Sequence, residues 1–269
     1  MRKLDFKDKW ILITGASSGL GKEIARQLAL QHQANLIIVA RRKTKLEALK
    51  KELESSAKVE VVVKTADLSI AEEVDKVVAF CLNERPLYGA VLNAGTTYFG
   101  KHQELEWSSF QTLMQTNIMG LMRMLNPIVQ HFEQGTQEGG LLIISSMAAF
   151  SPVPYQAAYS ATKAYLSNFS KALSHEIQNP NFSISVFEPG GIVTEMTDNH
   201  KFNDLRSWLM TVEKAASEAI YTLQQRKYRH IPGLQNQIGA LLMRFLPGKF
   251  IASRMAKIYH RALSKTASK

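Results

Sequence analysis

The sequence contains very little cysteine and no long apolar run. Cys81 is the only cysteine, so the chain cannot form an intramolecular disulfide, and a reducing compartment suits it. No apolar run approaches the ~20 residues that a membrane-spanning helix needs. Acidic residues precede the first apolar run and no small-residue cleavage site follows, which argues against a secretory signal. These absences predict a cytoplasmic protein.

Carboxylates are missing from the C-terminal fifth of the chain. The formal net charge is +10, and Glu218 is the last acidic residue. Residues 219–269 contain ten Lys and Arg residues, so the whole excess of positive charge lies in this segment. A charge distributed in this way calls for an explanation separate from that of the fold.

Short runs rich in Val, Ile and Leu alternate with longer segments of helical periodicity, a pattern typical of βαβ units and a parallel sheet. The runs are continuously apolar, as strands covered on both faces are. The sequence predicts an α/β fold with a doubly wound parallel sheet of about seven strands (residues 1–233), followed by a C-terminal helical extension (residues 234–269). Strands are expected at 10–14, 35–40, 59–63, 89–95, 141–145, 184–190 and 228–233, and helices at 20–32, 42–55, 70–83, 107–133, 158–178 and 212–225.

A glycine-rich loop, TGASSGLGKEIA, follows the first strand and opens a helix. Gly15, Gly19 and Gly21 would let the backbone approach a pyrophosphate, whose charge the helix N-terminus would meet. The spacing is G-x3-G-x-G rather than the commoner G-x-G-x-x-G, and glycines at such turns also occur without a ligand. The loop alone therefore leaves both interpretations open.

The second strand ends in VARRK, with no acid before Glu47. Sites for NAD place an acid here to bind the ribose hydroxyls, whereas an arginine suits the 2′-phosphate of NADP. Arg41 and Arg42 therefore predict NADP(H) as cofactor, with NAD(H) second. The alternative, a solvated helix start, is less favourable because cations there oppose the helix dipole.

The segment PYQAAYSATKAYL holds three tyrosines and one lysine. Tyr159 has Lys163 four residues later, on the same face of a helix, whereas Tyr155 and Tyr165 have no lysine at that offset. An ammonium group, together with a positive nicotinamide ring, lowers the pKa of a phenol and makes it a usable acid. Taken alone, such a pair is common by chance and is more typical of an amphipathic surface.

The fifth strand ends in LLIISS, so Ser145 and Ser146 lie at the carboxyl end of the sheet, where doubly wound folds bind ligands. With Ser146 thirteen residues before Tyr159, the sequence from about residue 8 to 233 resembles the short-chain dehydrogenase/reductase family. This resemblance implies a Rossmann-like fold and a catalytic tetrad of Asn117, Ser146, Tyr159 and Lys163.

The resemblance also implies a set of cofactor-binding residues. Besides Arg41, Arg42, Tyr159 and Lys163, the matching positions are Gly15, Ser17, Ser18, Gly19, Leu20, Gly21, Asp67, Leu68, Asn93, Ala94, Gly95, Pro189, Gly190, Ile192 and Thr194. Many NADP-preferring members carry a basic residue where Ser18 stands, so the discrimination rests on the two arginines. No metal site is predicted.

In the mechanism that the resemblance implies, Ser146 donates a hydrogen bond to the substrate oxygen and Tyr159 exchanges the proton. Lys163 holds the nicotinamide ribose and lowers the pKa of Tyr159, while Asn117 anchors a water of a proton relay. Tyr155 is assigned to the wall of the substrate pocket.

The segments that border the predicted pocket are apolar and contain no arginine cluster for an acidic substrate. This composition favours a lipophilic ketone or alcohol, although a segment over the site must also pack on its own domain. The predicted pocket residues are Met147, Tyr155, Met196, Phe202 and Trp208.

Residues 234–269 combine apolar residues at helical spacing with interleaved lysines and arginines. A helix of this kind lies on an anionic membrane surface, or it packs on its own domain or on a partner subunit, and the sequence does not separate these cases. Nucleic acid is not predicted as a partner, because no readout motif accompanies the charge. By analogy with the family, a homodimer or homotetramer would pair through helices 107–133 and 158–178.

The function predicted from the sequence is that of an NADP(H)-dependent oxidoreductase acting on a lipophilic carbonyl or secondary alcohol. A second prediction within the same class is reduction of long-chain 3-oxo lipid intermediates. A prediction of another class is a non-catalytic NADPH-sensing regulator or a membrane-surface binding protein.

Overall fold

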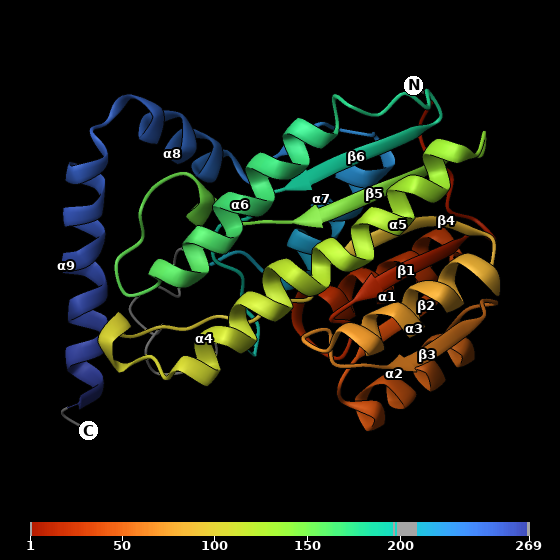
Figure 1. The fold of residues 1–269 in the computed structure, drawn as a ribbon, viewed down its shortest axis with the longest axis horizontal. Coiled ribbons are helices and arrows are strands. Elements are labelled where there is room, and N and C mark those ends of the chain that lie inside the picture. The colour runs from red at the N-terminus through yellow and green to blue at the C-terminus, as the bar shows by residue number, and fades with distance from the viewer. Residues whose placement is uncertain (1, 196, 198–208, 268–269) are drawn as a thin grey trace.

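The computed structural model describes residues 2–195, 197 and 209–267, and its core is a single parallel sheet (Figure 1). The strand order is β3-β2-β1-β4-β5-β6-β7, so the order reverses between β1 and β4. This confirms the predicted doubly wound, Rossmann-like fold. The strands are β1 (Trp10–Thr14), β2 (Asn35–Ala40), β3 (Val61–Thr65), β4 (Leu87–Leu92), β5 (Gly139–Ile144), β6 (Phe182–Phe187) and β7 (Arg229–His230).

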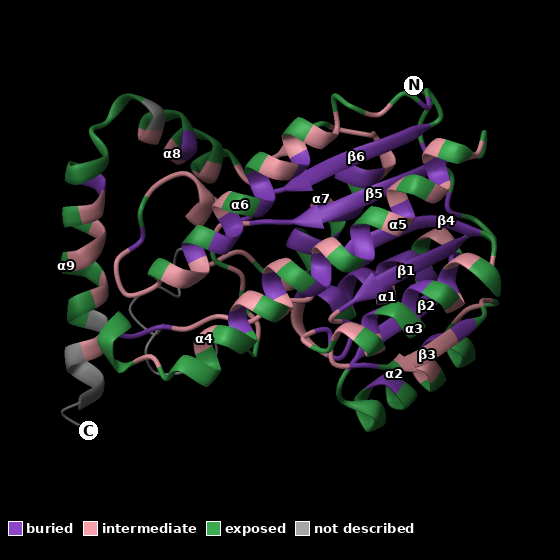
Figure 2. Cartoon of the chain, viewed as in Figure 1, coloured by how far each residue is buried: buried purple, intermediate pink, exposed green. Residues whose placement is uncertain are grey.

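Helices cover both faces of the sheet, which explains why the strands are continuously apolar (Figure 2). In β1, Ile11 and Ile13 belong to one core cluster, while Trp10 and Leu12 belong to the other. One face carries α1 (Gly19–His32), α2 (Lys43–Ser56) and α7 (Val212–Gln224), and the other carries α3 (Ala71–Asn83), α5 (Leu121–Gln134) and α6 (Ala157–Leu173).

Apart from the helix expected at 107–133, the predicted strands and helices are confirmed, with shifts at their ends. The strand expected at 89–95 ends at Leu92, because the amides of Asn93 and Ala94 turn away and donate to Thr14 Oγ1 at 2.9 and 3.0 Å. The fourth strand is thus tied to the first at the point where the sheet order reverses.

The long helix expected at 107–133 is interrupted. It consists of α4 (Trp107–Met114), a π-helical turn η2 (Gln115–Gly120) and α5. Within the turn, Asn117 is fully buried and bonds to the backbone of Thr96. Gly120 packs on the neighbouring loop so closely that a Cβ there would lie 1.9 Å from Leu68 O. The turn therefore follows from tertiary contacts that local periodicity does not contain.

The C-terminal extension forms α8 (Leu234–Phe245) and α9 (Gly248–Ala267), which lie outside the helical layers at the end of the molecule that carries α4 (Figure 1). Two short 3-10 turns follow neighbouring strands along the chain: η1 (His102–Glu104) comes after β4, and η3 (Met147–Ala149) comes after β5. Within the described residues, no helix combines the length and the apolar character needed to cross a bilayer. The domain boundary at residue 233 stays a prediction.

Candidate active site

Ser146 and Tyr159 meet at the carboxyl end of β5. Ser146 lies between β5 and η3, where its Oγ accepts the amide of Ala148 at 3.1 Å. The Tyr159 side chain, in the first turns of α6, forms a hydrogen bond with the Ser146 side chain. The two groups that the sequence predicts to contact a substrate oxygen are thus adjacent.

Lys163 lies one turn further along α6 and is 4% exposed. Its Nζ donates to the Ile144 carbonyl at 2.9 Å and lies 5.7 Å from the centroid of the Tyr159 ring. Burial lowers the pKa of Lys163 from 10.5 to about 8, because desolvation penalises the ammonium form. The lysine is therefore anchored to the end of β5 with its amine beside the tyrosine.

The environment of Tyr159 acts on its acidity in two directions. Burial raises the pKa of Tyr159, the hydrogen bond with Ser146 opposes this, and nearby Tyr259 adds to the increase. The protein groups alone thus raise the pKa of Tyr159, whereas a decrease was predicted from Lys163 and the nicotinamide charge acting together. Tyr159 is a protonated donor in this arrangement.

Asn117 connects the π-helical turn to the lysine. Its Nδ2 donates to Thr96 O at 2.9 Å and to Thr162 Oγ1 at 3.1 Å, and its Oδ1 accepts from Thr96 N at 2.8 Å. A Cβ on Gly95 would lie 3.2 Å from Asn117 Oδ1 and 3.6 Å from Lys163 Nζ. A glycine at this position therefore lets Asn117 and Lys163 approach the same stretch of backbone.

The glycine loop after β1 is required by its own packing. Gly15 and Gly19 have positive φ angles of 69° and 54°. A Cβ on Gly15 would lie 2.8 Å from Asn93 Nδ2, and one on Gly21 would lie 2.5 Å from the same atom. The loop is thus pressed onto the Asn93–Ala94 turn, and it brings the start of α1 to the point where the sheet order reverses.

The residues around this loop fit an anionic cofactor. The first turn of α1 contains no acid, and within the described chain no side chain caps its free amides. Arg42 donates to Ser17 Oγ at 3.1 and 3.0 Å and to Ser18 Oγ at 2.5 Å. A carboxylate, that of Glu195, is bound by Arg42 at 2.9 Å. This group of donors therefore already holds an oxyanion.

The two predicted arginines have different partners. Arg41 Nη1 lies 3.6 Å from Asp67 Oδ2, whereas Arg42 faces the glycine loop. Burial acts to raise the pKa of Asp67, but hydrogen bonds from Ser69 and the Arg41 charge outweigh it and keep the pKa below its usual value. Arg42 is therefore the arginine placed toward the phosphate-binding loop.

The segment after β6 lies between η3 and α8. Pro189 O accepts the Met147 amide at 2.8 Å, and a Cβ on Gly190 would lie 2.8 Å from Asn236 Oδ1. Ile192 packs against a core cluster, and the Thr194 side chain lies 3.2 Å from the position of a Cβ on Gly19. The segment predicted to hold the nicotinamide thus borders the glycine loop.

Of the predicted pocket residues, Met147 and Tyr155 are described and both face the C-terminal helices. Met147 Cε lies 3.8 Å from where a Cβ on Gly239 would be, and the Tyr155 hydroxyl lies 3.3 Å from His260 Nδ1. Tyr155 holds a positive φ of 65°, which is uncommon for a bulky residue. Met196, Phe202 and Trp208 lie outside the described residues.

Sequence reasoning missed Tyr259 and its partner Phe99. Their rings meet edge to face with centroids 5.1 Å apart, and Phe99 is 8% exposed. Tyr259 is close enough to Tyr159 to raise its pKa. The only signal in the sequence was the place of Tyr259 in the apolar stripe of the tail, which does not indicate what that stripe contacts.

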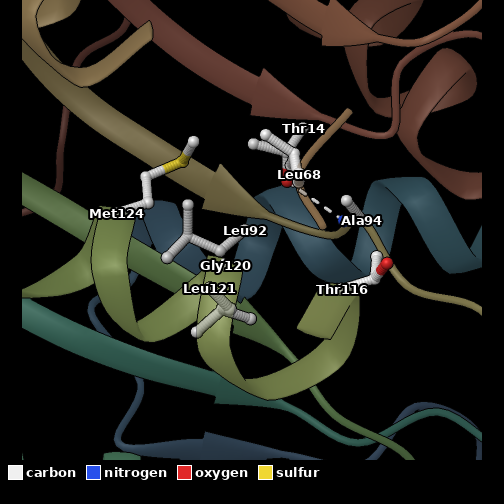
Figure 3. A pocket seen from close by; sticks show the side chains of 8 residues that line it. All are labelled: Thr14, Leu68, Leu92, Ala94, Thr116, Gly120, Leu121 and Met124. Atoms are coloured by element: carbon white, nitrogen blue, oxygen red, sulfur yellow. Dashed lines mark hydrogen bonds between the residues drawn. The ribbon is translucent and has the colours of Figure 1, made fainter. Parts of the chain in front are cut away.

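A small cavity lies beneath the Asn93–Gly95 turn (Figure 3). Its volume of about 10 Å³ suits one water molecule rather than a nucleotide. Figure 3 shows the Thr14 side chain on one wall, hydrogen-bonded to the Ala94 amide, with Leu68 beside it. The cavity therefore lies behind the predicted cofactor residues Leu68 and Ala94, and it is too small to be the substrate site.

Known proteins resemble this chain over most of its length. The family profile described as short chain dehydrogenase matches residues 9–204. Inactive hydroxysteroid dehydrogenase-like protein 1 of Homo sapiens is 28% identical over 262 residues, which cover 96% of this chain and 78% of the human protein. The very-long-chain 3-oxoacyl-CoA reductase of Meyerozyma guilliermondii is 35% identical over 181 residues, 64% of this chain and 53% of the yeast protein.

Among solved structures, a short-chain dehydrogenase from Sphingobium yanoikuyae in complex with NADPH is 26% identical to this chain. The two superimpose with a TM-score of 0.78 over 89% of this chain and 96% of the other.

Proposed function

Because the chain belongs to the short-chain dehydrogenase family, we propose that it is an NADP(H)-dependent oxidoreductase that interconverts a lipophilic carbonyl and its secondary alcohol. The observation that carries the proposal is the convergence of Ser146, Tyr159 and Lys163 at the carboxyl end of β5, with Asn117 behind the lysine. These groups supply a hydrogen-bond donor, a proton donor and a cation around one point beside the glycine loop.

NADP(H) is the proposed cofactor. Arg42, Ser17 and Ser18 would hold its 2′-phosphate, and the amides that begin α1 would hold its pyrophosphate. The NADPH complex of the Sphingobium relative supports this choice. Bound NADP(H) would donate or accept a hydride at the reacting carbon.

The chain's own residues would manage the oxygen of the substrate. Ser146 Oγ would donate a hydrogen bond to the oxygen as negative charge develops there. Tyr159 would deliver its hydroxyl proton to that oxygen in reduction and remove it in oxidation. Lys163 would stabilise the phenolate that remains, because its amine lies next to the ring and is shielded from water. Asn117 would hold a relay water beside Lys163.

A lipophilic substrate is supported by apolar and aromatic side chains that α9 and two loops bring near the site. Phe99 and Tyr259 pack together near Tyr159, and Val153, 5% exposed, lies in the loop between η3 and α6. The name of the yeast relative, a very-long-chain 3-oxoacyl-CoA reductase, supports the narrower proposal of long-chain 3-oxo lipid substrates.

The substrate proposal predicts a dependence on chain length. We expect kcat/KM for NADPH oxidation to rise about fourfold for each added methylene, until the pocket is filled, because each buried methylene contributes about 0.8 kcal/mol. The measurement is the rate against a ladder of 3-oxoacyl thioesters and simple ketones of increasing length. A preference for short or polar carbonyls would contradict the lipophilic proposal and leave the catalytic residues unaffected.

A non-catalytic NADPH sensor is the second candidate, favoured by the word inactive in the name of the human relative. The presence of Ser146, Tyr159 and Lys163 in contact opposes it. Tight NADPH binding with no turnover across the whole substrate ladder would favour the sensor.

We further propose that the protein is cytoplasmic and contacts membrane surfaces through the outer face of its C-terminal helices. The inner face of α8 and α9 packs on the body of the protein through Ala240, Ile251 and Tyr259. The outer face carries the exposed cations Lys249, Arg254 and Lys257. It also exposes eight large apolar side chains, those of Leu234, Ile238, Leu241, Leu242, Phe245, Leu246, Phe250 and Ile258. Since this segment has no carboxylate, a second copy of it would repel it, whereas anionic lipid would attract it.

The membrane proposal predicts that Phe245→Asp reduces co-sedimentation with phosphatidylserine-containing vesicles by tenfold or more, because Phe245 is 79% exposed and would lose its insertion into lipid. Ile70→Asp is the matched control, since Ile70 is 42% exposed at the N-cap of α3, where Asp is favourable. Equal vesicle binding by both variants would refute the proposed face. Equal binding to neutral vesicles and to vesicles that contain phosphatidylserine would refute the role of the cations.

Pairing of subunits through α5 and α6 remains a proposal. The outer surfaces of the η2 turn and α6 expose Met119 and Tyr165, at 57% and 40%. If this face pairs two subunits, a Tyr165→Asp variant should show a lower molecular mass in light scattering than the unaltered protein.

A further inference from the structure

Glu195 forms an ion-pair bridge beside the proposed cofactor site that the function proposed above does not use. Its Oε2 accepts from Arg42 Nη1 at 2.9 Å, and its Oε1 accepts from Lys45 Nζ at 2.6 Å. Arg42 and Lys45 belong to the end of β2 and the start of α2, whereas Glu195 belongs to the segment after β6. The carboxylate therefore joins the two sides of the sheet's reversal point.

The bridge crosses the glycine loop. Thr194 lies against Gly19, since a Cβ on that glycine would be 3.2 Å from Thr194 Cγ2. Thr197 Oγ1 accepts the Thr194 amide at 3.0 Å and donates to Ile192 O at 2.7 Å, which fixes the turn that presents Glu195. The turn that carries Glu195 is thus packed against the glycine loop, and its carboxylate is bound by Arg42 and Lys45.

The donors that bind Glu195 are those that suit a 2′-phosphate. Arg42 is fixed by Ser17 and Ser18 along two of its nitrogens, and the remaining nitrogen, Nη1, is directed at Glu195. Hydrogen bonds from Lys45 and Arg42 hold the pKa of Glu195 at about 2, so the group is an anion at any working pH. A phosphomonoester and this carboxylate are both oxyanions and cannot share the same donors without repulsion.

We infer that Glu195 is a specificity-determining residue that competes with the ribose 2′-phosphate for Arg42 and Lys45, and so weakens binding of NADP(H) relative to NAD(H). NAD(H) has no 2′-phosphate, so it leaves the bridge intact. This inference rests on the proposed function, because it assumes that a nicotinamide dinucleotide occupies the cleft.

The test is calorimetric binding to the full-length chain, which requires no turnover. We expect Glu195→Gln to lower the Kd of NADPH and of adenosine 2′,5′-bisphosphate about fivefold, which is the size of a partly exposed charge interaction. The Kd of NADH and of adenosine 5′-monophosphate should change by less than about twofold, because neither probe displaces the bridge. The gain should shrink at high ionic strength.

Two further variants distinguish competition from a general charge effect. Glu47→Gln removes the same charge from exposed α2, near Lys45 in sequence but outside the bridge, and should leave both Kd values unchanged. In an Arg42→Gln background, the gain from Glu195→Gln should fall to less than about half, because the shared donor is gone.

An unchanged or weaker NADPH affinity in Glu195→Gln would overturn the inference, and so would an equal gain for NADH. If neither dinucleotide bound the unaltered chain, the proposed function itself would fail. If the dinucleotides bound the unaltered chain and Glu195→Gln with the same Kd, the role of Glu195 would be overturned and the proposed function would stand.

Discussion

Replacing Tyr159 by Phe lowers kcat for carbonyl reduction by about 10²–10⁴-fold, the range over which a positioned general acid accelerates a reaction. The phenol forms a hydrogen bond with the Ser146 side chain, and burial raises its pKa, so the proton is present at neutral pH. The ring itself would remain in place. We therefore expect the Kd of NADPH to change by less than about twofold, which places the loss in the chemical step.

The neighbouring tyrosines provide matched controls for this substitution. Tyr155→Phe removes a hydroxyl that faces His260, and Tyr165→Phe alters a residue that stacks on Phe169. Both should retain kcat within about fivefold, because neither group lies beside Lys163. Steady-state rates and NADPH titration of the three variants decide the assignment. Substantial activity in Tyr159→Phe would show that another group donates the proton.

Replacing Lys163 by Met separates catalysis from stability. Burial lowers the pKa of Lys163 from 10.5 to about 8, so the unfolded chain binds this proton more tightly than the folded chain. Burying the charged amine of Lys163 therefore costs about 3 kcal/mol of folding free energy at neutral pH. The hydrogen bond to the Ile144 carbonyl offsets about 1 kcal/mol of this cost. We expect Lys163→Met to be more stable by about 1–2 kcal/mol and to lose about 10²-fold or more in kcat.

The pH dependence checks the sign of this effect. Between pH 8 and 10.5 the unfolded chain retains the proton that the folded chain has released, so the contribution of Lys163 to stability becomes less unfavourable as pH rises. The advantage of Lys163→Met in urea unfolding should therefore shrink by about 1 kcal/mol from pH 7 to pH 9. Comparing the two proteins at each pH cancels other groups, such as Cys81, whose thiol pKa burial raises to about 12. An advantage that does not depend on pH would contradict the account.

The architecture was predictable because its signals are local and periodic. Continuous apolar strands and the helices between them predicted the sheet and both of its layers, and the order of Ser146, Tyr159 and Lys163 placed three groups at one edge. Their contact depends only on the end of β5 and one turn of α6. Motifs tied to regular elements could thus be located from sequence.

The missed features depend on contacts between distant segments. The residues around Tyr259 in the sequence do not indicate that its ring packs on Phe99. Those around Glu195 do not indicate that its carboxylate pairs with Arg42 and Lys45. The π-helical turn at Asn117 likewise follows from bonds to Thr96, twenty-one residues earlier. The predicted lowering of the Tyr159 pKa considered charge but not desolvation, which acts the other way and dominates within the protein.

The two faces of α9 constrain how this part of the chain can vary in evolution. Ends of domains usually tolerate insertions and deletions. Here, one residue inserted in α9 before Tyr259 would rotate the remainder of the helix by about 100°. Tyr259, which now meets Phe99, would leave the site, and a neighbour such as exposed Ile258 would approach it. We therefore expect homologous lineages to conserve the length of the helix up to Tyr259, and to exchange residues on the outer face of α9 only for others of apolar or basic character.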